Sequence, residues 1–344
     1  MKAMRLTGIS KMEMFEVPDP KITNDTDVLI RMTNVGVCGS DVHYYVSGKI
    51  GDQVVAYPFT VGHEGAGIVE KIGIAVKHVK PGDRIAIDPA MPCWQCDQCK
   101  AGRSHTCRKL RFLGCPGQAE GCLSEYIVMP ETSCFLIKNN LSLDDAALSE
   151  PLTIGVYALK LSLMKQGMDI GILGCGPIGL SVITAASVQK PGKLFATDKL
   201  DYRLDVALSS GASWIGNPDK TDIISTIKNI EPGMLDIVFE CCGQQEAIDQ
   251  AVTLLKPGGK LMIIGIPDVD HYHFSINELR RKEICIQNVR RQNESLQDCL
   301  NLLSSNKINA SHWITHRFKL SETKKAFDLV AGYKDGVIKA MIEM

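Results

Sequence analysis

Hydrophobic and polar positions follow two different rhythms along the 344-residue chain. In the first part, short β-prone runs are separated by dense turn signals. These runs lie at residues 27–32, 65–72, 83–87 and 123–128. Short runs bounded by turns predict an irregular β domain for this part of the chain.

From about residue 155, strand-like and helix-like segments alternate. The predicted strands are 169–173, 193–197, 235–239 and 260–265, and the predicted helices are 158–164, 178–189, 202–210, 222–230 and 245–255. Alternation at this interval predicts right-handed βαβ units and a parallel sheet covered on both faces. Beyond about residue 280 the chain is polar and helical again at 295–304, with a β-like segment at 314–318.

The longest apolar run, residues 170–188, raises the alternative of a membrane span. Its first half contains Gly171, Gly174, Gly176, Pro177 and Gly179. Those residues favour a strand–turn–helix segment instead. We therefore expect no membrane span and a cytoplasmic protein.

Composition narrows the class of partner. The chain is 45% hydrophobic and 22% charged, which is typical of a globular protein, and its length allows two domains. A net charge of −1 gives no general attraction to nucleic acid or anionic lipid. With 13 cysteines and no secretory pattern at its start, the chain is expected in a reducing compartment.

Four cysteines at short spacing form the most specific chemical signature. Cys93, Cys96 and Cys99 follow one another at intervals of three, and Cys107 comes eight residues later. Four thiolates at this spacing are typical of a tetrahedral zinc site. An iron–sulfur cluster is the alternative metal group. A four-thiolate zinc has no open position, so a catalytic site must lie elsewhere.

The segment Gly174-Cys-Gly176-Pro-Ile-Gly179 lies between a predicted strand and a predicted helix. Gly174 permits a tight turn, Gly176 lets a pyrophosphate approach the backbone, and Gly179 lets helix and strand pack closely. The helix N-terminus offers N–H groups to the phosphates. Asp198 follows Gly179 by 19 residues, where a carboxylate accepts hydrogen bonds from the adenosine ribose. Together these features predict a dinucleotide-binding Rossmann domain.

Asp198 also favours NAD over NADP, because its charge would repel a 2′-phosphate. Lys199 and Arg203 follow closely and could partly offset that repulsion. We expect NAD as the cofactor.

Three segments before residue 155 combine zinc-ligand side chains with small or polar neighbours. They contain Cys38 with Ser40 and His43, His63 with Glu64, and Glu150. Catalytic zinc usually takes three protein ligands and leaves one position for water or substrate. Cys38, His63 and a carboxylate would satisfy that set. Taken singly, Cys38 could be a structural thiol and His63 a loop histidine.

Taken together, these motifs resemble those of zinc-dependent medium-chain alcohol dehydrogenases. The segments G-V-C-G-S-D-V-H-Y, G-H-E-G-A-G, C-x-x-C-x-x-C-x7-C, S-E-P and G-x-G-x-x-G occur in that family's order and span almost the whole chain. Within the family, residues 38–44, 48–51 and 288–290 are most similar to the sorbitol (polyol) dehydrogenase branch.

The resemblance implies an α/β fold of two domains. Residues 1–154 and 280–344 would form a GroES-like, irregular β catalytic domain with a structural zinc lobe at 90–110. Residues 155–279 would form a doubly wound, parallel-sheet Rossmann NAD domain. The family also implies a homo-oligomer, either a dimer or a tetramer.

The same resemblance implies roles for the catalytic residues. Cys38, His63 and Glu64 would hold a catalytic zinc with a bound water, and Glu150 would hold that water or the substrate. Whether Glu64 or Glu150 binds zinc in the resting state stays open. With the four-cysteine site, we expect two zinc ions per chain. The substrate proton would leave through the zinc-bound water, Glu150 or Ser40. His43 would then carry the proton onward, although His43 could instead be a surface histidine with no catalytic role.

Contacts with the substrate and the cofactor are also implied. Tyr44, Glu150 and Arg290 would bind a polyol. Arg291 stands where the polyol dehydrogenase pattern usually has tyrosine. A second guanidinium could bind a phosphate, so a sugar-alcohol phosphate remains an alternative substrate. The other interpretation is that Arg291 pairs with an acidic neighbour and points away from the substrate. Further cofactor contacts are expected at Pro177, Ile178, Arg203, Gly265, Ile266 and Val289.

These expectations combine into one functional prediction. The chain would be an NAD- and zinc-dependent enzyme that reversibly oxidises a secondary hydroxyl of a polyol, such as sorbitol, xylitol or arabitol, to a ketose. A threonine, butanediol or sugar-alcohol phosphate dehydrogenase is the alternative within the family. A zinc module that binds nucleic acid or protein is the alternative from another class, but the cysteine cluster lacks the aromatic and basic surroundings it would need.

Overall fold

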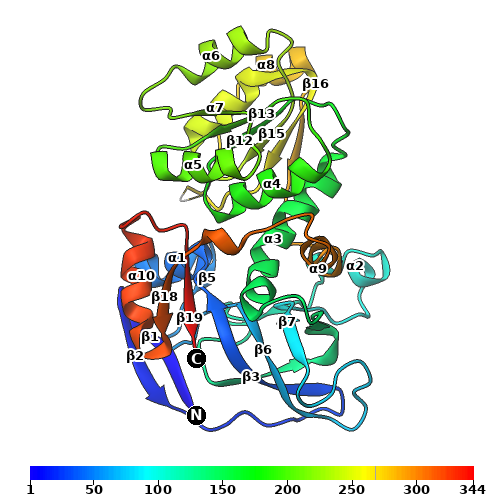
Figure 1. Ribbon diagram of the computed structural model, residues 1–344, viewed down its shortest axis with the longest axis vertical. Coiled ribbons are helices and arrows are strands. Elements are labelled where there is room, and N and C mark those ends of the chain that lie inside the picture. The colour runs from blue at the N-terminus through cyan, green and yellow to red at the C-terminus, as the bar shows by residue number, and fades with distance from the viewer. Residues whose placement is uncertain (268) are drawn as a thin grey trace. The chain divides into compact units, whose positions relative to one another are not determined.

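The computed structural model describes residues 1–267 and 269–344, which form two compact units (Figure 1). Unit 1 comprises Met1–Glu150 and Leu296–Met344, and unit 2 comprises Pro151–Ser295. The chain thus leaves unit 1 after residue 150 rather than 154 and returns at residue 296 rather than 280. The later return arises because residues 285–288 form a strand of the unit 2 sheet.

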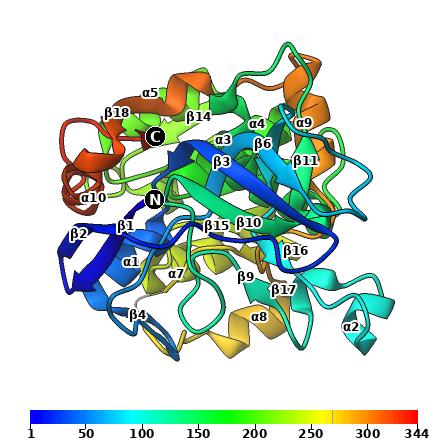
Figure 2. The same ribbon diagram turned by 90° about the horizontal axis from the view of Figure 1, so that it is seen from below.

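Unit 1 is built on a seven-stranded sheet. Its strands are, in order, β11 (Cys134–Leu136), β7 (Arg84–Ile87), β6 (Glu64–Ile72), β3 (Asp27–Gly36), β19 (Lys339–Glu343) and β18 (Ile314–Lys319), with β10 (Tyr126–Pro130) also paired to β3. Figure 2 shows β3 beside both β6 and β10. The sheet therefore places the start of β6 close to the end of β3 and the start of β19.

The other elements of unit 1 are short. They are β1 (Lys2–Gly8), β2 (Lys11–Glu16), α1 (Gly39–Ser47), β4 (Lys49–Ile50), β5 (Gln53–Val54), β8 (Ala90–Met91), α2 (Asp97–Lys100), η1 (Ser104–Thr106), β9 (Arg111–Phe112), η2 (Glu131–Ser133), α9 (Leu296–Ser304), η3 (Ser311–Trp313), η4 (Leu320–Glu322) and α10 (Thr323–Ala331). The chain passes from unit 1 to unit 2 inside α3 (Leu143–Ser162).

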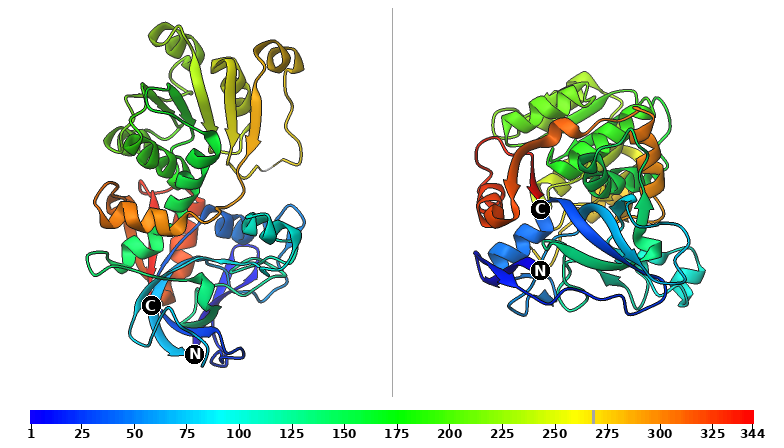
Figure 3. Two further views of the ribbon diagram at one scale, coloured as in Figure 1. Left: turned by 90° about the vertical axis from the view of Figure 1, so that its right-hand side faces the viewer. Right: turned by 60° about the horizontal axis from the view of Figure 1, so that its bottom comes forward.

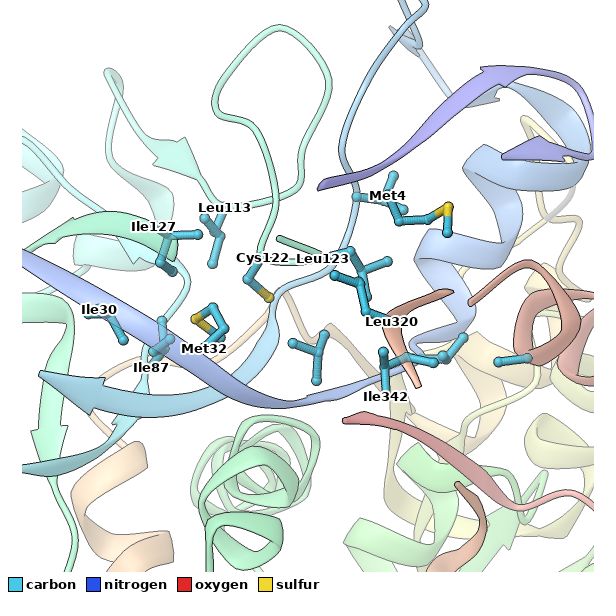
Figure 4. Packing of buried hydrophobic residues seen from close by; sticks show 14 of the residues in the cluster. Met4, Ile30, Met32, Ile87, Leu113, Cys122, Leu123, Ile127, Leu320 and Ile342 are labelled. Carbon is cyan, nitrogen blue, oxygen red and sulfur yellow. The ribbon is translucent and has the colours of Figure 1, made fainter. Parts of the chain in front are cut away.

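A hydrophobic core joins the strands of unit 1. Figure 4 shows Met32, Ile87 and Cys122 directed toward one another in this core. Gly65 permits their approach, because a Cβ there would lie 2.8 Å from Met32 Cε and 3.2 Å from both Cys122 Sγ and Ile87 Cδ1. Cys122 is therefore a small core residue.

Helix α1 begins directly after Cys38 and is anchored through Tyr45. The Tyr45 ring meets Phe327 of α10 edge to face, with 5.4 Å between ring centroids. The Tyr45 hydroxyl donates a 2.6 Å hydrogen bond to Asp328. These contacts fix the helix that carries His43 and Tyr44.

Unit 2 contains a six-stranded parallel sheet, which confirms that prediction. Its strands are, in order, β14 (Trp214–Gly216), β13 (Leu194–Thr197), β12 (Ile170–Leu173), β15 (Leu235–Glu240), β16 (Leu255–Ile263) and β17 (Cys285–Asn288). Helices lie on both sides (Figure 3): α4 (Pro177–Val188), α5 (Asp201–Ser209), α6 (Ile223–Ile230), α7 (Gln245–Leu254) and α8 (Ile276–Lys282). The strand order reverses between β12 and β15, which is where such sheets bind ligands.

The apolar run at 170–188 forms β12, a glycine turn and α4. Strand β12 is buried along its whole length, so the apolar character of this run belongs to the sheet core. Across the described residues, no helix is both long enough and apolar enough to cross a membrane.

Candidate metal, cofactor and catalytic sites

The four lobe cysteines converge in the loop between β8 and β9. Cys107 Sγ lies 3.4 Å from Cys93 Sγ and 3.8 Å from Cys96 Sγ, and Cys96 Sγ lies 3.6 Å from Cys99 Sγ. A tetrahedral site with Zn–S bonds of about 2.3 Å requires sulfur separations of about 3.8 Å. The donor set therefore fits a structural zinc ion.

Backbone groups prepare this cluster for a metal. N–H groups of Cys99 and Arg108 lower the pKa of the Cys96 thiol to about 6. Cys96 precedes the first residue of α2, where helix N–H groups are unpaired. The lowered pKa of Cys96 favours its thiolate, the form that binds zinc, whereas burial and the neighbouring thiols raise the pKa of Cys99 to about 12.

His63 lies beside Cys38 and Asp41 in the buried part of unit 1. Its Nδ1 is 3.3 Å from Asp41 Oδ1, which also accepts the Gly62 N–H at 3.2 Å. Burial alone would lower the His63 pKa, but the charges of Asp41 and Cys38 outweigh it and raise the pKa well above its usual value. Because Asp41 engages Nδ1, the other ring nitrogen is left for a metal.

Glu64 is turned toward Lys339. Lys339 Nζ lies 2.8 Å from Glu64 Oε1 and 2.7 Å from Oε2, and it also donates to the Val37 carbonyl at 3.2 Å. Both charged side chains are 1% exposed. Both oxygens of Glu64, a predicted zinc ligand, are thus engaged by Lys339.

Glu150 is the remaining carboxylate of the predicted set, and it is buried. Burial raises its pKa to about 7, with the His63 charge opposing that shift and the Glu64 charge adding to it. Among the described residues, the lobe cysteines are the one group whose ligand atoms all lie within 4.8 Å of one another. Cys38, His63 and Glu150 thus share one region without closing into an equally compact cluster.

The other predicted catalytic residues lie on or near α1, except the arginine. Ser40 Oγ donates to Cys38 Sγ at 3.3 Å, and His43 is half-buried. Tyr44 is buried at 4% exposure. Arg290 is exposed in unit 2, two residues after β17.

The predicted phosphate turn has the geometry that the glycine pattern requires. Gly174 has a left-handed φ of 98°, and a Cβ there would lie 2.8 Å from Cys242 Cβ. A Cβ on Gly179 would lie 1.8 Å from the Gly174 carbonyl oxygen. Gly176 and Pro177 begin α4, so the helix N-terminus faces the turn.

Asp198 is fixed against this turn. Its Oδ2 accepts the Cys175 N–H at 2.7 Å, and its Oδ1 accepts the Leu200 N–H at 2.9 Å. Arg203 Nη1 lies 3.8 Å from Oδ2. A carboxylate has about four acceptor positions, so two remain for ribose hydroxyls.

The later cofactor residues also follow strands of the parallel sheet. Gly265 and Ile266 come after β16, and Val289 comes after β17 with its N–H bonded to the Ile263 carbonyl at 2.8 Å. A Cβ on Gly265 would lie 2.3 Å from the Gly243 nitrogen. The carboxyl edge of the sheet therefore gathers residues from four strands around one predicted dinucleotide site.

Comparison with known proteins decides the family. Residues 24–139 match the family model "Alcohol dehydrogenase GroES-like domain", and residues 177–305 match "Zinc-binding dehydrogenase". The chain is 34% identical to sorbitol dehydrogenase of Bacillus subtilis (strain 168), over 99% of this chain and 97% of that protein. This chain belongs to the zinc-dependent medium-chain alcohol dehydrogenase family.

Other similar proteins are also dehydrogenases or reductases. The chain is 32% identical to D-xylulose reductase A of Aspergillus oryzae, over 98% of this chain and 95% of that protein. A dehydrogenase of unknown specificity from Escherichia coli superimposes with a TM-score of 0.93 at 30% identity, covering 99% and 98% of the two chains. A zinc-binding dehydrogenase from Sinorhizobium meliloti 1021, bound to NADP, gives 0.91 at 28% identity, covering 100% and 99%.

These findings confirm the predicted fold class, a GroES-like domain with a Rossmann-like parallel sheet. They also confirm an oxidoreductase of the sorbitol dehydrogenase-like branch. Zinc and a nicotinamide dinucleotide are its cofactors.

Two residues in contact with the dehydrogenase's predicted ligands were not assigned from sequence. Asp41 orients His63, and its signal was its place in the same motif as Cys38. Lys339 binds Glu64, and its signal was a single charge inside the apolar run at 337–342. A charge in a strand that is otherwise apolar requires a buried partner.

Proposed function

We propose that this enzyme reversibly oxidises a secondary hydroxyl of a polyol to a ketose, with NAD as the hydride acceptor. The observation that carries the proposal is the end-to-end similarity to proteins named sorbitol dehydrogenase and D-xylulose reductase. His63 interacts electrostatically with both Cys38 and Glu150 in unit 1, which supports a catalytic zinc site there.

Cys38, His63 and Glu150 are the proposed ligands of the catalytic zinc. Glu64 stays on Lys339 in the resting enzyme, because both of its oxygens are engaged there. Asp41 orients the His63 ring. The second zinc is structural and takes the thiolates of Cys93, Cys96, Cys99 and Cys107.

When bound, the zinc acts as a Lewis acid on the substrate hydroxyl and the dinucleotide accepts a hydride. The chain's own residues then move the proton. Ser40 Oγ, 3.3 Å from Cys38 Sγ, lies next to the ligand set and takes the proton first. His43, on the following turn of the half-buried α1 surface, carries it toward solvent.

NAD is the proposed cofactor rather than NADP. Asp198 is held by two backbone N–H groups beside the phosphate turn, where its charge opposes a 2′-phosphate. Arg203, 3.8 Å away, neutralises part of that charge. A preference for NAD, rather than complete rejection of NADP, follows from this balance.

The proposal is tested by steady-state turnover with a panel of substrates. Sorbitol, xylitol and arabitol are compared with 2,3-butanediol, threonine and a sugar-alcohol phosphate, each with NAD⁺ and with NADP⁺. The highest kcat/KM should belong to a free polyol with NAD⁺. Turnover of a comparison substrate and of none of the three polyols would contradict the proposed function.

We also propose that the enzyme works in the cytoplasm as a homodimer or homotetramer on small molecules. All 13 cysteines are free thiols, which is typical of a reducing compartment. Light scattering of the zinc-loaded protein tests the assembly, and a monomer at micromolar concentration would contradict it.

A further inference from the structure

The hydroxyl of Tyr44 belongs to a polar cluster with Gln53 and Cys115. Tyr44 Oη donates to Gln53 Oε1 at 2.8 Å and lies 3.8 Å from Cys115 Sγ. Tyr44 is buried, whereas Gln53 is half-buried, so part of its side chain is exposed.

A short loop connects this cluster with His63. The rings of Phe112 and His63 have centroids 5.5 Å apart. Two residues on, a Cβ at Gly114 would lie 2.6 Å from the Gly62 carbonyl oxygen. The loop therefore runs against the backbone next to His63 and ends with Cys115 at the Tyr44 hydroxyl. Through Tyr44 and Cys115, this loop links Gln53 to the backbone beside His63.

Two small rigid elements hold Gln53 in place. Gly48 ends α1 with a left-handed φ of 70°, and its N–H bonds the Tyr44 carbonyl at 3.0 Å. The chain then forms the β4–β5 hairpin, in which Gln53 pairs with Ile50. The Val55 N–H closes the unit on the Gly48 carbonyl at 2.8 Å. The hairpin thus returns Gln53 to the helix that carries Tyr44.

The hydrogen bond from the Tyr44 hydroxyl leaves the nitrogen of the Gln53 amide available. The hydroxyl engages Oε1, so Nε2 and its two N–H donors are directed away from the tyrosine. Within residues 1–267 and 269–344, no group accepts a hydrogen bond from Nε2, although the same side chain is anchored at Oε1. An anchored amide with free donors, held by a residue that the sequence predicts to bind a polyol, is suited to bind a hydroxyl oxygen.

We propose that Gln53 is a specificity-determining residue, whose Nε2 donates a hydrogen bond to a substrate hydroxyl beyond the carbon that is oxidised. This inference rests on the proposed function and deepens it. It means that the enzyme selects alcohols with several hydroxyls over secondary alcohols or diols without further oxygens. Tyr44, whose hydroxyl is engaged by Gln53 and Cys115, then acts as a positioning residue that fixes the amide, in place of the direct polyol contact that the sequence predicted.

The test is the ratio of kcat/KM for xylitol to kcat/KM for 2,3-butanediol, which has no hydroxyl beyond its diol. Gln53→Leu keeps a similar volume but removes both donors. Loss of one hydrogen bond to a substrate hydroxyl should lower the ratio about 10-fold, which corresponds to about 1.4 kcal/mol. The fall should come from xylitol, with kcat/KM for 2,3-butanediol changed by less than about threefold.

Two further variants separate recognition from structure. Val54→Ala changes the exposed neighbour on the same strand and should leave the ratio unchanged. Tyr44→Phe frees the amide without removing it, so the ratio should fall by less than in Gln53→Leu. Thermal unfolding of each holoenzyme checks that the fold is retained.

The outcomes are distinguishable. If the wild-type enzyme oxidises no polyol, the proposed function fails. If it oxidises xylitol but Gln53→Leu lowers both substrates equally, or neither, the role of Gln53 is overturned while the proposed function stands.

Discussion

Lys339 and Glu64 form an enclosed ion pair, with Lys339 Nζ 2.8 Å from Glu64 Oε1 and 2.7 Å from Oε2, and with both side chains 1% exposed. The pair joins the start of β19 to the start of β6, on either side of β3. It lies next to His63, the residue before Glu64. The ion pair engages both oxygens of Glu64, and for this reason Glu150 is the proposed carboxylate ligand of the catalytic zinc.

Gly36 of β3 makes room for this pair. It lies opposite Glu64 in the register of β3 and β6. A Cβ on Gly36 would lie 2.2 Å from Glu64 Oε2. Any side chain at residue 36 would thus displace the Glu64 carboxylate from Lys339.

Lys339→Met should strongly destabilise the protein. The variant leaves the Glu64 charge buried without a partner, which costs about 3–5 kcal/mol of unfolding free energy. Adding Glu64→Gln should recover part of that loss, since the unpaired charge is removed. Urea unfolding of the wild type, both single variants and the double variant measures the cycle. A loss below about 1 kcal/mol in Lys339→Met would show that the pair is not enclosed.

Glu64 and Glu150 should differ in their effect on zinc. Glu64→Gln keeps an oxygen that accepts from Lys339 and should retain the catalytic zinc. Glu150→Gln removes a proposed ligand charge and should lose that zinc during dialysis against a weak chelator. Zinc content by mass spectrometry is the measurement. The opposite ranking of the two variants would make Glu64 the resting ligand.

Asp198→Asn should shift cofactor preference. The substitution removes the charge but keeps an oxygen that can accept the Cys175 or Leu200 N–H. Hydrogen bonds to charged groups are worth about 1.5–3 kcal/mol, so the ratio of kcat/KM for NAD⁺ to that for NADP⁺ should fall at least about 10-fold. Steady-state kinetics with both cofactors measures the ratio. An unchanged ratio would mean that Asp198 does not select the cofactor.

The stability that Asp328 contributes by holding Tyr45 of α1 should depend on pH in the acid range. Burial alone raises its pKa, but hydrogen bonds from Lys324 and Tyr45 outweigh it and hold the pKa below the usual 3.8. A carboxyl with a lowered folded-state pKa stabilises the fold above its unfolded pKa and loses that contribution as pH falls through its folded pKa. Wild type should therefore be more stable than Asp328→Asn at neutral pH, and the difference should shrink below pH about 3.8.

This comparison uses thermal unfolding of both proteins across the acid range. Lys11→Ala, on the exposed end of β2, is a control that should show no such trend. A stability difference between wild type and Asp328→Asn that stays constant into strong acid would contradict the role of Asp328.

The sequence predicted most of what depends on local spacing. The turn at Gly174 and the convergence of Cys93 and Cys107 follow from residues close together in the chain, and both have the expected geometry. The parallel sheet was predictable because each βαβ unit is itself a local pattern.

Long-range pairing explains what the sequence did not reveal. Lys339 reaches Glu64 across 275 residues, and β17 continues the sheet through an edge strand that is only partly buried, so its apolar pattern is weak. The contact between Gln53 and Tyr44 depends on the β4–β5 hairpin, which the sequence did not predict. Such contacts depend on strand order and register, which periodicity alone does not specify.

If one chain carries two zinc sites of different function, then zinc content and activity should separate in variants of each site. Wild type should hold two zinc ions per chain, and Cys38→Ser and Cys96→Ser should each hold about one. Cys38→Ser should lose alcohol turnover while keeping the lobe zinc. Cys96→Ser should keep the catalytic zinc, and its main defect should be lower stability rather than a direct loss of turnover. A wild-type protein with a single zinc ion, or loss of both ions in Cys38→Ser, would contradict the two-site account.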